Sequence, residues 1–178
     1  MTIQDKTEMI QGKGYIIALK MDNGQTKNIK LIDKQNIYNN RLQVINQYEV
    51  PDGAHSNRYD VTILVNGLPL VHIELKRRGV PIKEAFNQID RYLRDSFWAG
   101  KAMFDYVQVF VISNGTETKY YSNTTRYAKE QEGAGGQRKN KTDGNTFEFT
   151  SYWSDQENNF LTDLRDSVQR EQQMTFDW

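Results

Sequence analysis

The sequence feature that most constrains the fold is the stretch DVTILVNGLPLVHIELK at residues 60 to 76. Two short apolar runs flank Asn66-Gly67, a dipeptide typical of tight hairpin turns, so the stretch predicts a β-hairpin. Its first strand opens on Asp60, and its second ends in Glu74-Leu75-Lys76. A strand that only fills a core does not need three ionisable groups at its open end, so these groups are candidates for a ligand-binding or metal-binding site.

Alternation along both strands gives each of them two faces. In the first strand, Val61, Ile63 and Val65 lie on one face and Asp60, Thr62 and Leu64 on the other. In the second strand, Val71, Ile73 and Leu75 lie on one face and His72, Glu74 and Lys76 on the other. If both apolar faces enter one core, Asp60 lies on the same side as Glu74 and Lys76. A two-residue or four-residue loop alone would put Asp60 on the opposite side. The sequence therefore predicts an odd loop, such as three residues with a left-handed Gly67 and a bulge, or an even loop with one bulge elsewhere.

That register brings two carboxylates to one end of the hairpin, with an ammonium on the same side. Carboxylates within reach of each other repel, so one of them would keep a proton unless a cation lies between them. The carboxylates of Asp60 and Glu74 and the carbonyl of Leu75 are oxygen ligands, which suit Mg²⁺. A metal held there can polarise a phosphoryl oxygen and lower the pKa of a bound water. Lys76 would then orient that water and stabilise charge that develops on the phosphate.

The same residues also fit a solvated strand edge, where Glu-x-Lys pairs are common. Two neighbouring features favour a site instead. The acids are attached to apolar strands, and the next segment places Gln88 and Tyr92 four residues apart, hence on one face of a helix. His72 shares the face of Glu74, and we expect a partly buried structural histidine there.

The rest of the chain predicts an α/β fold with a mixed central sheet flanked by helices. Strands are expected over 14–20, 26–33, 42–50, 106–113 and 117–123, the first two as a hairpin, and apolar residues at helical spacing predict a crossover helix over 82–97. Residues 128–146 lack apolar periodicity and predict a mobile basic loop, in which Arg138, Lys139 and Lys141 are candidate contacts to DNA phosphates. Residues 147–178 form an acidic C-terminal segment.

Composition excludes several classes of function. A chain of 178 residues suits one domain. Its 23 basic and 23 acidic residues balance, so a charged partner must be met by a local patch. The chain has no cysteine, which removes disulfides, thiolate metal sites and cysteine nucleophiles and fits a reducing compartment. No long apolar run or signal-like start is present, so a cytoplasmic location is expected.

The motifs together resemble a known family. Asp60, Glu74-x-Lys76 and Gln88-x-x-x-Tyr92, with the wording DVTILVNGLPLVHIELK and VFVISNGTE at 109–117, resemble the N-terminal nuclease domain of the restriction (R) subunit of type I restriction-modification enzymes. The resemblance covers roughly residues 14–126. The catalytic signature alone belongs to the whole PD-(D/E)xK nuclease superfamily, whereas the wording VNGLPLVxIELK is much more specific to the type I subunit.

The resemblance implies a restriction-endonuclease-like core that cuts double-stranded DNA with Mg²⁺, or with Mn²⁺ as a substitute. It implies that Asp60 and Glu74 bind the metal, that Lys76 is the catalytic lysine, and that Gln88 and Tyr92 support the site or contact DNA. Two positions depart from the pattern, since Tyr59 stands where the superfamily signature has proline and Glu8 is a poor match for the acid of an early helix. The family's R subunit also carries an ATP-driven motor and works with methylase and specificity subunits. No phosphate-loop pattern occurs in this chain, so ATP is expected to serve only the motor of the full-length subunit.

Basic residues follow the candidate site closely. Seven basic and three acidic residues lie between Lys76 and Lys101, and Arg77, Arg78 and Lys83 could hold DNA phosphates, although a solvated helix face has the same composition. Three alternatives to a Mg²⁺-dependent endonuclease stay open. They are a catalytically silent nuclease fold that binds DNA or assembles a complex, another nuclease of the superfamily such as a repair exonuclease or resolvase, and an interaction domain that works through its acidic tail.

Overall fold

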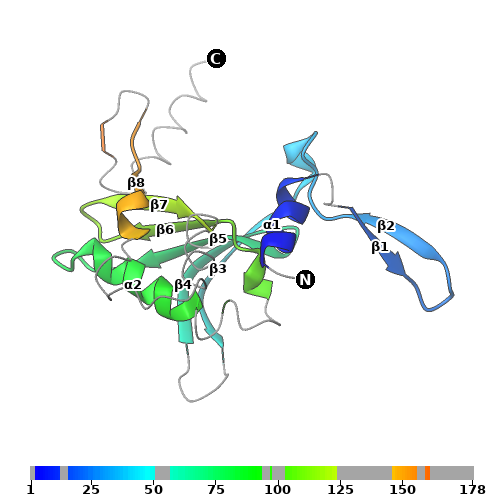
Figure 1. The fold of residues 1–178 in the computed structure, drawn as a ribbon, viewed down its shortest axis with the longest axis horizontal. Helices are drawn as coiled ribbons and strands as arrows, with labels where there is room; N and C mark the ends of the chain where they lie inside the picture. The colour runs from blue at the N-terminus through cyan, green and yellow to red at the C-terminus, as the bar shows by residue number, and fades with distance from the viewer. Residues whose placement is uncertain are drawn as a thin grey trace, which may run out of the picture. The chain divides into compact units, whose positions relative to one another are not determined.

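The fold is built on a six-stranded sheet whose strands lie in chain order, β3-β4-β5-β6-β7-β8, with β1 and β2 forming a separate two-stranded sheet (Figure 1). The computed structural model describes residues 3–12, 16–50, 57–93, 97, 103–123, 146–155 and 159–160. The strands are β1 (Ile16–Lys20), β2 (Thr26–Lys30), β3 (Leu42–Val50), β4 (Asn57–Val65), β5 (Leu68–Leu75), β6 (Val109–Ser113), β7 (Thr118–Ser122) and β8 (Ser151–Tyr152). The α-helices are α1 (Ile3–Gln11) and α2 (Ile82–Tyr92), and the short 3₁₀ helices are η1 (Ile37–Asn39), η3 (Met103–Tyr106) and η4 (Thr146–Phe149).

The large sheet is mixed, as the sequence predicted. Antiparallel ladders join β3 to β4, β6 to β7 and β7 to β8. Between β5 and β6, the amide of Gln108 donates to the carbonyl of Leu70 and the amide of Lys76 donates to that of Ser113. Both residue numbers rise together, so β5 and β6 run parallel, and such a pair needs a crossover connection. Helix α2 lies in that connection, which confirms the predicted α/β class.

Contacts divide the chain into two compact units, residues 1–71 with 93–108 and residues 72–92 with 109–178. In the first unit, β1 and β2 form the predicted hairpin around Gly24, whose φ is 81°. Helix α1 contacts η3, where Lys6 and Asp105 form an ion pair. The ring of Tyr59 packs edge-on against Phe97 and Phe104, with centroids 4.5 and 4.7 Å away. This aromatic cluster is the core of the first unit.

In the second unit, α2 packs against β6 (Figure 1). The apolar stripe of the helix is buried along its length and comprises Ile82, Ala85, Phe86, Ile89 and Tyr92. The ring of Phe86 lies 5.1 Å from that of Tyr121 on β7. Strand β6 is buried from Phe110 to Ser113, as its apolar sequence predicted. The predicted helix over 82–97 is confirmed for 82–92, while residues 94–96 lie outside the described part of the chain.

The hairpin turn differs from the first alternative that the sequence suggested. Asn66 and Gly67 alone separate β4 from β5, and both have positive φ, 52° and 85°. These angles are those of a two-residue type I′ turn, whose twist matches that of the strands, so the three-residue loop is wrong. The buried residues of β4, Tyr59 and Thr62, are three apart and so break strict alternation. A bulge near Asp60 would produce this change, so the even loop with a bulge elsewhere stays a prediction.

The buried side of β5 is also the reverse of the one expected. His72 and Glu74 have no exposed surface, whereas Leu75 on the supposedly apolar side is 42% exposed. The expectation that both apolar faces of the hairpin enter the core is therefore wrong for β5. The reason is the position of α2, whose Tyr92 ring lies 6.1 Å from the ring of His72. The helix covers the polar side of the strand, so charged groups are enclosed with it.

Several predictions fall outside the described residues. Of the predicted basic loop 128–146, residues 128–145 lie outside the described part of the chain and Thr146 begins η4. Of the acidic segment, the structure describes 147–155 and 159–160. There, β8 adds to the sheet edge and Lys119 of β7 is buried, with its Nζ 4.0 Å from the ring centre of Tyr152 and 4.7 Å from that of Phe147. Among the described residues, no helix is long and apolar enough to cross a membrane.

Candidate active site

The candidate site begins at the end of β5, where Glu74 and Lys76 lie on the side covered by α2. Glu74 is fully buried, and its Oε1 accepts a hydrogen bond from Nζ of Lys76 at 2.7 Å. The backbone of Lys76 is also fixed, because its amide donates to the carbonyl of Ser113 on β6 at 2.7 Å. The sheet therefore continues one residue past β5 and holds the lysine in place.

Helix α2 adds the next two members of the cluster. Nζ of Lys76 also donates to Oε1 of Gln88, and Nε2 of Gln88 donates to the hydroxyl of Tyr92. An ammonium can only donate, so it requires the oxygen of the amide and leaves the NH₂ group to face Tyr92. The four residues form a continuous chain of hydrogen bonds, Glu74–Lys76–Gln88–Tyr92. The sequence predicted that these residues share a face of their strand or helix, and the structure brings them together.

The second carboxylate oxygen of Glu74 has no such partner. Oε2 is buried and makes no hydrogen bond. A buried polar group without a hydrogen-bond partner costs about 1–3 kcal/mol, and a charged group costs more. An oxygen of this kind fits a hard cation such as Mg²⁺, which takes one or two carboxylates and keeps several waters. Within the described residues, no group of three or more histidine or acidic side chains that could hold a metal occurs.

Asp60 belongs to the other unit. It is half-buried on β4, between Tyr59 and Val61, which pair with Tyr48 and Asn46 of β3. Gln47, between those two β3 residues, has a φ of 49°, so the ladder is irregular beside Asp60. The convergence of Asp60 with Glu74 stays a prediction.

Two side chains close to Glu74 were not assigned to the site from the sequence. His72 is fully buried rather than partly buried, and its Nε2 lies 3.7 Å from Oε2 of Glu74. Tyr121 on β7 is 4% exposed, and its pKa is raised well above 10.0, mainly by burial and further by the negative charge of Glu74. The alternation in β5 marked His72 as a neighbour of Glu74, whereas no motif singled out Tyr121.

The hydroxyl of Tyr121 makes no hydrogen bond in its buried position. We therefore expect Tyr121→Phe to raise the free energy of unfolding by about 1 kcal/mol, since a buried unsatisfied polar group costs roughly that much. Chemical denaturation checks the value, with Tyr120→Phe on the same strand, where the side chain is 41% exposed, as a matched control. A loss of stability specific to Tyr121→Phe would show that the hydroxyl has a partner.

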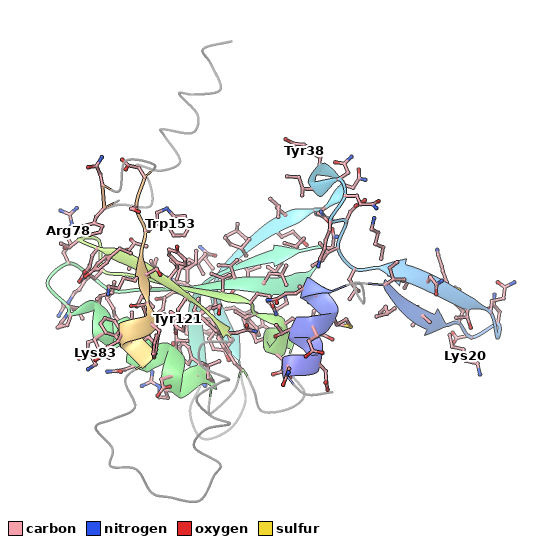
Figure 2. The ribbon with its side chains drawn as sticks, turned by 45° about the horizontal axis from the view of Figure 1, so that its top comes forward. Lys20, Tyr38, Arg78, Lys83, Tyr121 and Trp153 are labelled. Carbon is pink, nitrogen blue, oxygen red and sulfur yellow. The ribbon has the colours of Figure 1, made fainter. Side chains whose placement is uncertain are left out.

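Arg77 and Arg78 lie on the connection between β5 and α2, and Lys83 lies in the first turn of α2. Figure 2 shows Arg78 and Lys83. Arg77, Arg78 and Lys83 are all exposed. Nε of Arg78 donates to the carbonyl of Gly115 at 2.9 Å, and Nδ2 of Asn114 donates to the carbonyl of Val80 at 2.9 Å. The Asn114-Gly115 turn thus holds the β5–α2 connection. Gly115 has a φ of 71°, and a Cβ there would lie 3.2 Å from Cγ of Arg78.

The fold and the cluster define a class of protein. A mixed sheet with Glu-x-Lys at a strand end and Gln-x-x-x-Tyr on the crossover helix is an α/β fold of the nuclease-like kind. Residues 1–129 match the family described as type I restriction enzyme R protein N terminus, and the chain belongs to that family.

Curated relatives agree with this membership. The chain is 50% identical over 152 residues to the type I restriction enzyme EcoprrI endonuclease subunit of Escherichia coli. This match covers 85% of the chain and 44% of the relative. It is 39% identical over 168 residues to the SsaAORF53P endonuclease subunit of Staphylococcus saprophyticus, covering 89% of this chain and 16% of the relative. It is 38% identical over 149 residues to the SauMSSORF170P endonuclease subunit of Staphylococcus aureus, and the match covers 84% of this chain and 14% of the relative. The chain spans less than half the length of these relatives.

Proposed function

We propose that this chain is a nuclease domain that hydrolyses phosphodiester bonds of double-stranded DNA with the help of Mg²⁺. The observation that carries the proposal is the hydrogen-bonded chain Glu74–Lys76–Gln88–Tyr92, which encloses a buried carboxylate with one open oxygen. Membership of the type I restriction enzyme R family supports it. In a complete R protein, an ATP-driven motor and the methylase and specificity subunits would act together with this domain, and none of their functions is assigned to this chain.

Asp60, Glu74 and the carbonyl of Leu75 are the residues that would hold the metal, with Mn²⁺ as a possible substitute. A divalent cation bound there supplies Lewis-acid polarisation of the phosphate and activation of a water molecule. The open oxygen of Glu74 and the position of Leu75 next to it, where the residue is 42% exposed, support this donor set. All three donors are oxygens, as Mg²⁺ prefers.

The side chains divide the remaining work between them. Lys76 donates both to Glu74 and to Gln88, so its ammonium is restrained at two points and its third proton is left for the attacking water or a phosphate oxygen. Gln88 is in turn oriented by the hydroxyl of Tyr92. This arrangement fixes a positive charge in advance of the reaction, which is the condition under which a charge stabilises a transition state most effectively.

The test is metal binding by calorimetry followed by nicking of supercoiled plasmid on the same samples. Wild type is expected to bind Mg²⁺ and to nick DNA, and Glu74→Gln, which keeps the shape but removes the charge, is expected to bind Mg²⁺ at least tenfold more weakly, roughly the size of effect seen for metal-site substitutions. Loss of nicking in Glu74→Gln also excludes a contaminating nuclease. Metal binding without nicking favours a silent module or a domain that needs its partner subunits, and a preference for DNA ends or junctions favours another nuclease type.

The basic connection provides an independent test of DNA binding. Arg77 is exposed immediately after Lys76, so Arg77→Ala is expected to lower the slope of log binding constant against log salt concentration by about 0.9, the value for one phosphate contact on duplex DNA. Fluorescence anisotropy at several salt concentrations, with EDTA present to prevent cleavage, measures this slope. Lys20→Ala, an exposed lysine on the β1–β2 hairpin (Figure 2), is the matched control and should leave the slope unchanged. Equal slopes for wild type and Arg77→Ala would remove Arg77 from the DNA surface.

A further inference from the structure

His72 occupies a position next to Glu74 that its sequence context does not demand. Both side chains lie on the covered side of β5, two residues apart, and neither has any exposed surface. The imidazole ring meets the ring of Tyr92 nearly edge-on, with centroids 6.1 Å apart and an interplanar angle of 77°. The same Tyr92 anchors Gln88 of the hydrogen-bonded chain. Packing therefore directs the histidine toward the carboxylate of Glu74.

The distance between the two groups indicates what they can do together. Nε2 of His72 lies 3.7 Å from Oε2 of Glu74, which is beyond the range of about 2.7–3.2 Å for a direct hydrogen bond from nitrogen to oxygen. The separation is small enough for one ion to contact both atoms. Lys76 already occupies Oε1, so Oε2, the oxygen nearest the imidazole, is the one left open.

Resting on the proposed function, we propose that His72 is a metal-selecting residue, and that its Nε2 joins Oε2 of Glu74 in binding one divalent first-row transition-metal ion. Mg²⁺ is a hard cation that prefers oxygen and holds its waters strongly, so a neutral imidazole adds little to its binding. Divalent transition-metal ions accept imidazole nitrogen. The inference adds a nitrogen to the oxygen donors, so that His72 raises the affinity for Mn²⁺ relative to that for Mg²⁺.

The first test compares two metals on two proteins. Calorimetric titration with Mn²⁺ and with Mg²⁺ is carried out on wild type and on His72→Leu, which removes the ring nitrogens and is similar in size. The expected result is an increase of about tenfold in the Kd for Mn²⁺, the lower end of the range for substitutions around metal sites, with a change of less than twofold for Mg²⁺. A Mn²⁺ to Mg²⁺ affinity ratio that is the same in both proteins would overturn the proposal.

A second measurement needs no variant and so does not depend on how well His72→Leu folds. Pulsed electron paramagnetic resonance of wild type loaded with Mn²⁺ reports nitrogen nuclei bound to the metal. Coupling to an imidazole nitrogen is expected in wild type, and its absence would overturn the proposal. His72→Gln, which keeps a polar side chain, should bind Mn²⁺ without this coupling.

The outcome for Glu74→Gln separates this inference from the proposed function. If Glu74→Gln binds both ions as wild type does, the metal site is not at Glu74, and both proposals fail. If Glu74→Gln loses both ions while His72→Leu keeps the wild-type Mn²⁺ to Mg²⁺ ratio, the metal site that the proposed function needs stays at Glu74 and only the role of His72 fails. Ile89→Val serves as a control for a buried substitution in the same unit, because Ile89 on α2 is 0% exposed, and it should leave the ratio unchanged.

Discussion

Replacing Lys76 by methionine is expected to slow DNA cleavage by about 10²- to 10³-fold while Mg²⁺ binding stays at the wild-type level or becomes tighter. The rate loss is the usual effect of removing one preorganised charge from a catalytic site. Binding should not weaken, because the ammonium now bound to Oε1 of Glu74 at 2.7 Å competes with the metal for that carboxylate. Calorimetry and single-turnover cleavage of a plasmid at saturating Mg²⁺ measure the two quantities separately.

Methionine also removes the cation that neutralises a fully buried carboxylate, and breaking a buried ion pair in this way costs about 3–5 kcal/mol. The control is the double variant Glu74→Gln with Lys76→Met, which contains neither charge and is expected to recover most of the lost stability. Lys76→Arg keeps the charge but replaces a compact ammonium by a planar fork, so it should retain stability better than it retains activity. If Mg²⁺ binding falls in parallel with cleavage in Lys76→Met, the lysine acts by holding Glu74 in place, and its catalytic role is wrong.

Spacing alone predicted each of the two residue pairs in the cluster. Glu74 and Lys76 are two apart on a strand, and Gln88 and Tyr92 are four apart on a helix, so each pair must share a face whatever the rest of the chain does. Joining the two pairs needed only the crossover helix that a parallel strand pair requires. Local periodicity was therefore sufficient to group the residues within each pair, but it did not predict that the two pairs meet.

Periodicity could not predict which face of β5 the helix covers. Alternation groups His72 with Glu74, and Val71 with Ile73, but it is the docking of α2 that decides which group is buried. Hydrophobicity favoured the wrong group, because an apolar face normally faces the core. The burial of the polar face leaves Oε2 of Glu74 without a hydrogen bond, a local cost that is typical of functional sites.

The sequence did not decide between the two turn alternatives, for a different reason. The two-residue loop is fixed by bonds that are distant in sequence, since Oδ1 of Asn66 accepts from the amide of Arg41 at 2.7 Å and its Nδ2 donates to the carbonyl of Leu31 at 2.8 Å. A register argument confined to residues 60–76 contains neither partner. These bonds also explain why asparagine, which tolerates positive φ better than most residues, occupies the first position of the turn.

Gly67→Val is expected to destabilise the protein by about 2 kcal/mol, since a β-branched residue held at positive φ costs roughly 1–3 kcal/mol. The φ of Gly67 is 85°, and no atom lies within 4 Å of an added Cβ, so backbone strain alone accounts for the loss. Gly24→Val is the matched control, because Gly24 has a φ of 81° and equally open surroundings. The β1–β2 hairpin that contains Gly24 is exposed along its strands and can lose its turn without unfolding the core. Denaturant unfolding should therefore show a much smaller loss of unfolding free energy for Gly24→Val than for Gly67→Val. Equal losses would mean that the β4–β5 turn contributes no more to stability than the β1–β2 turn.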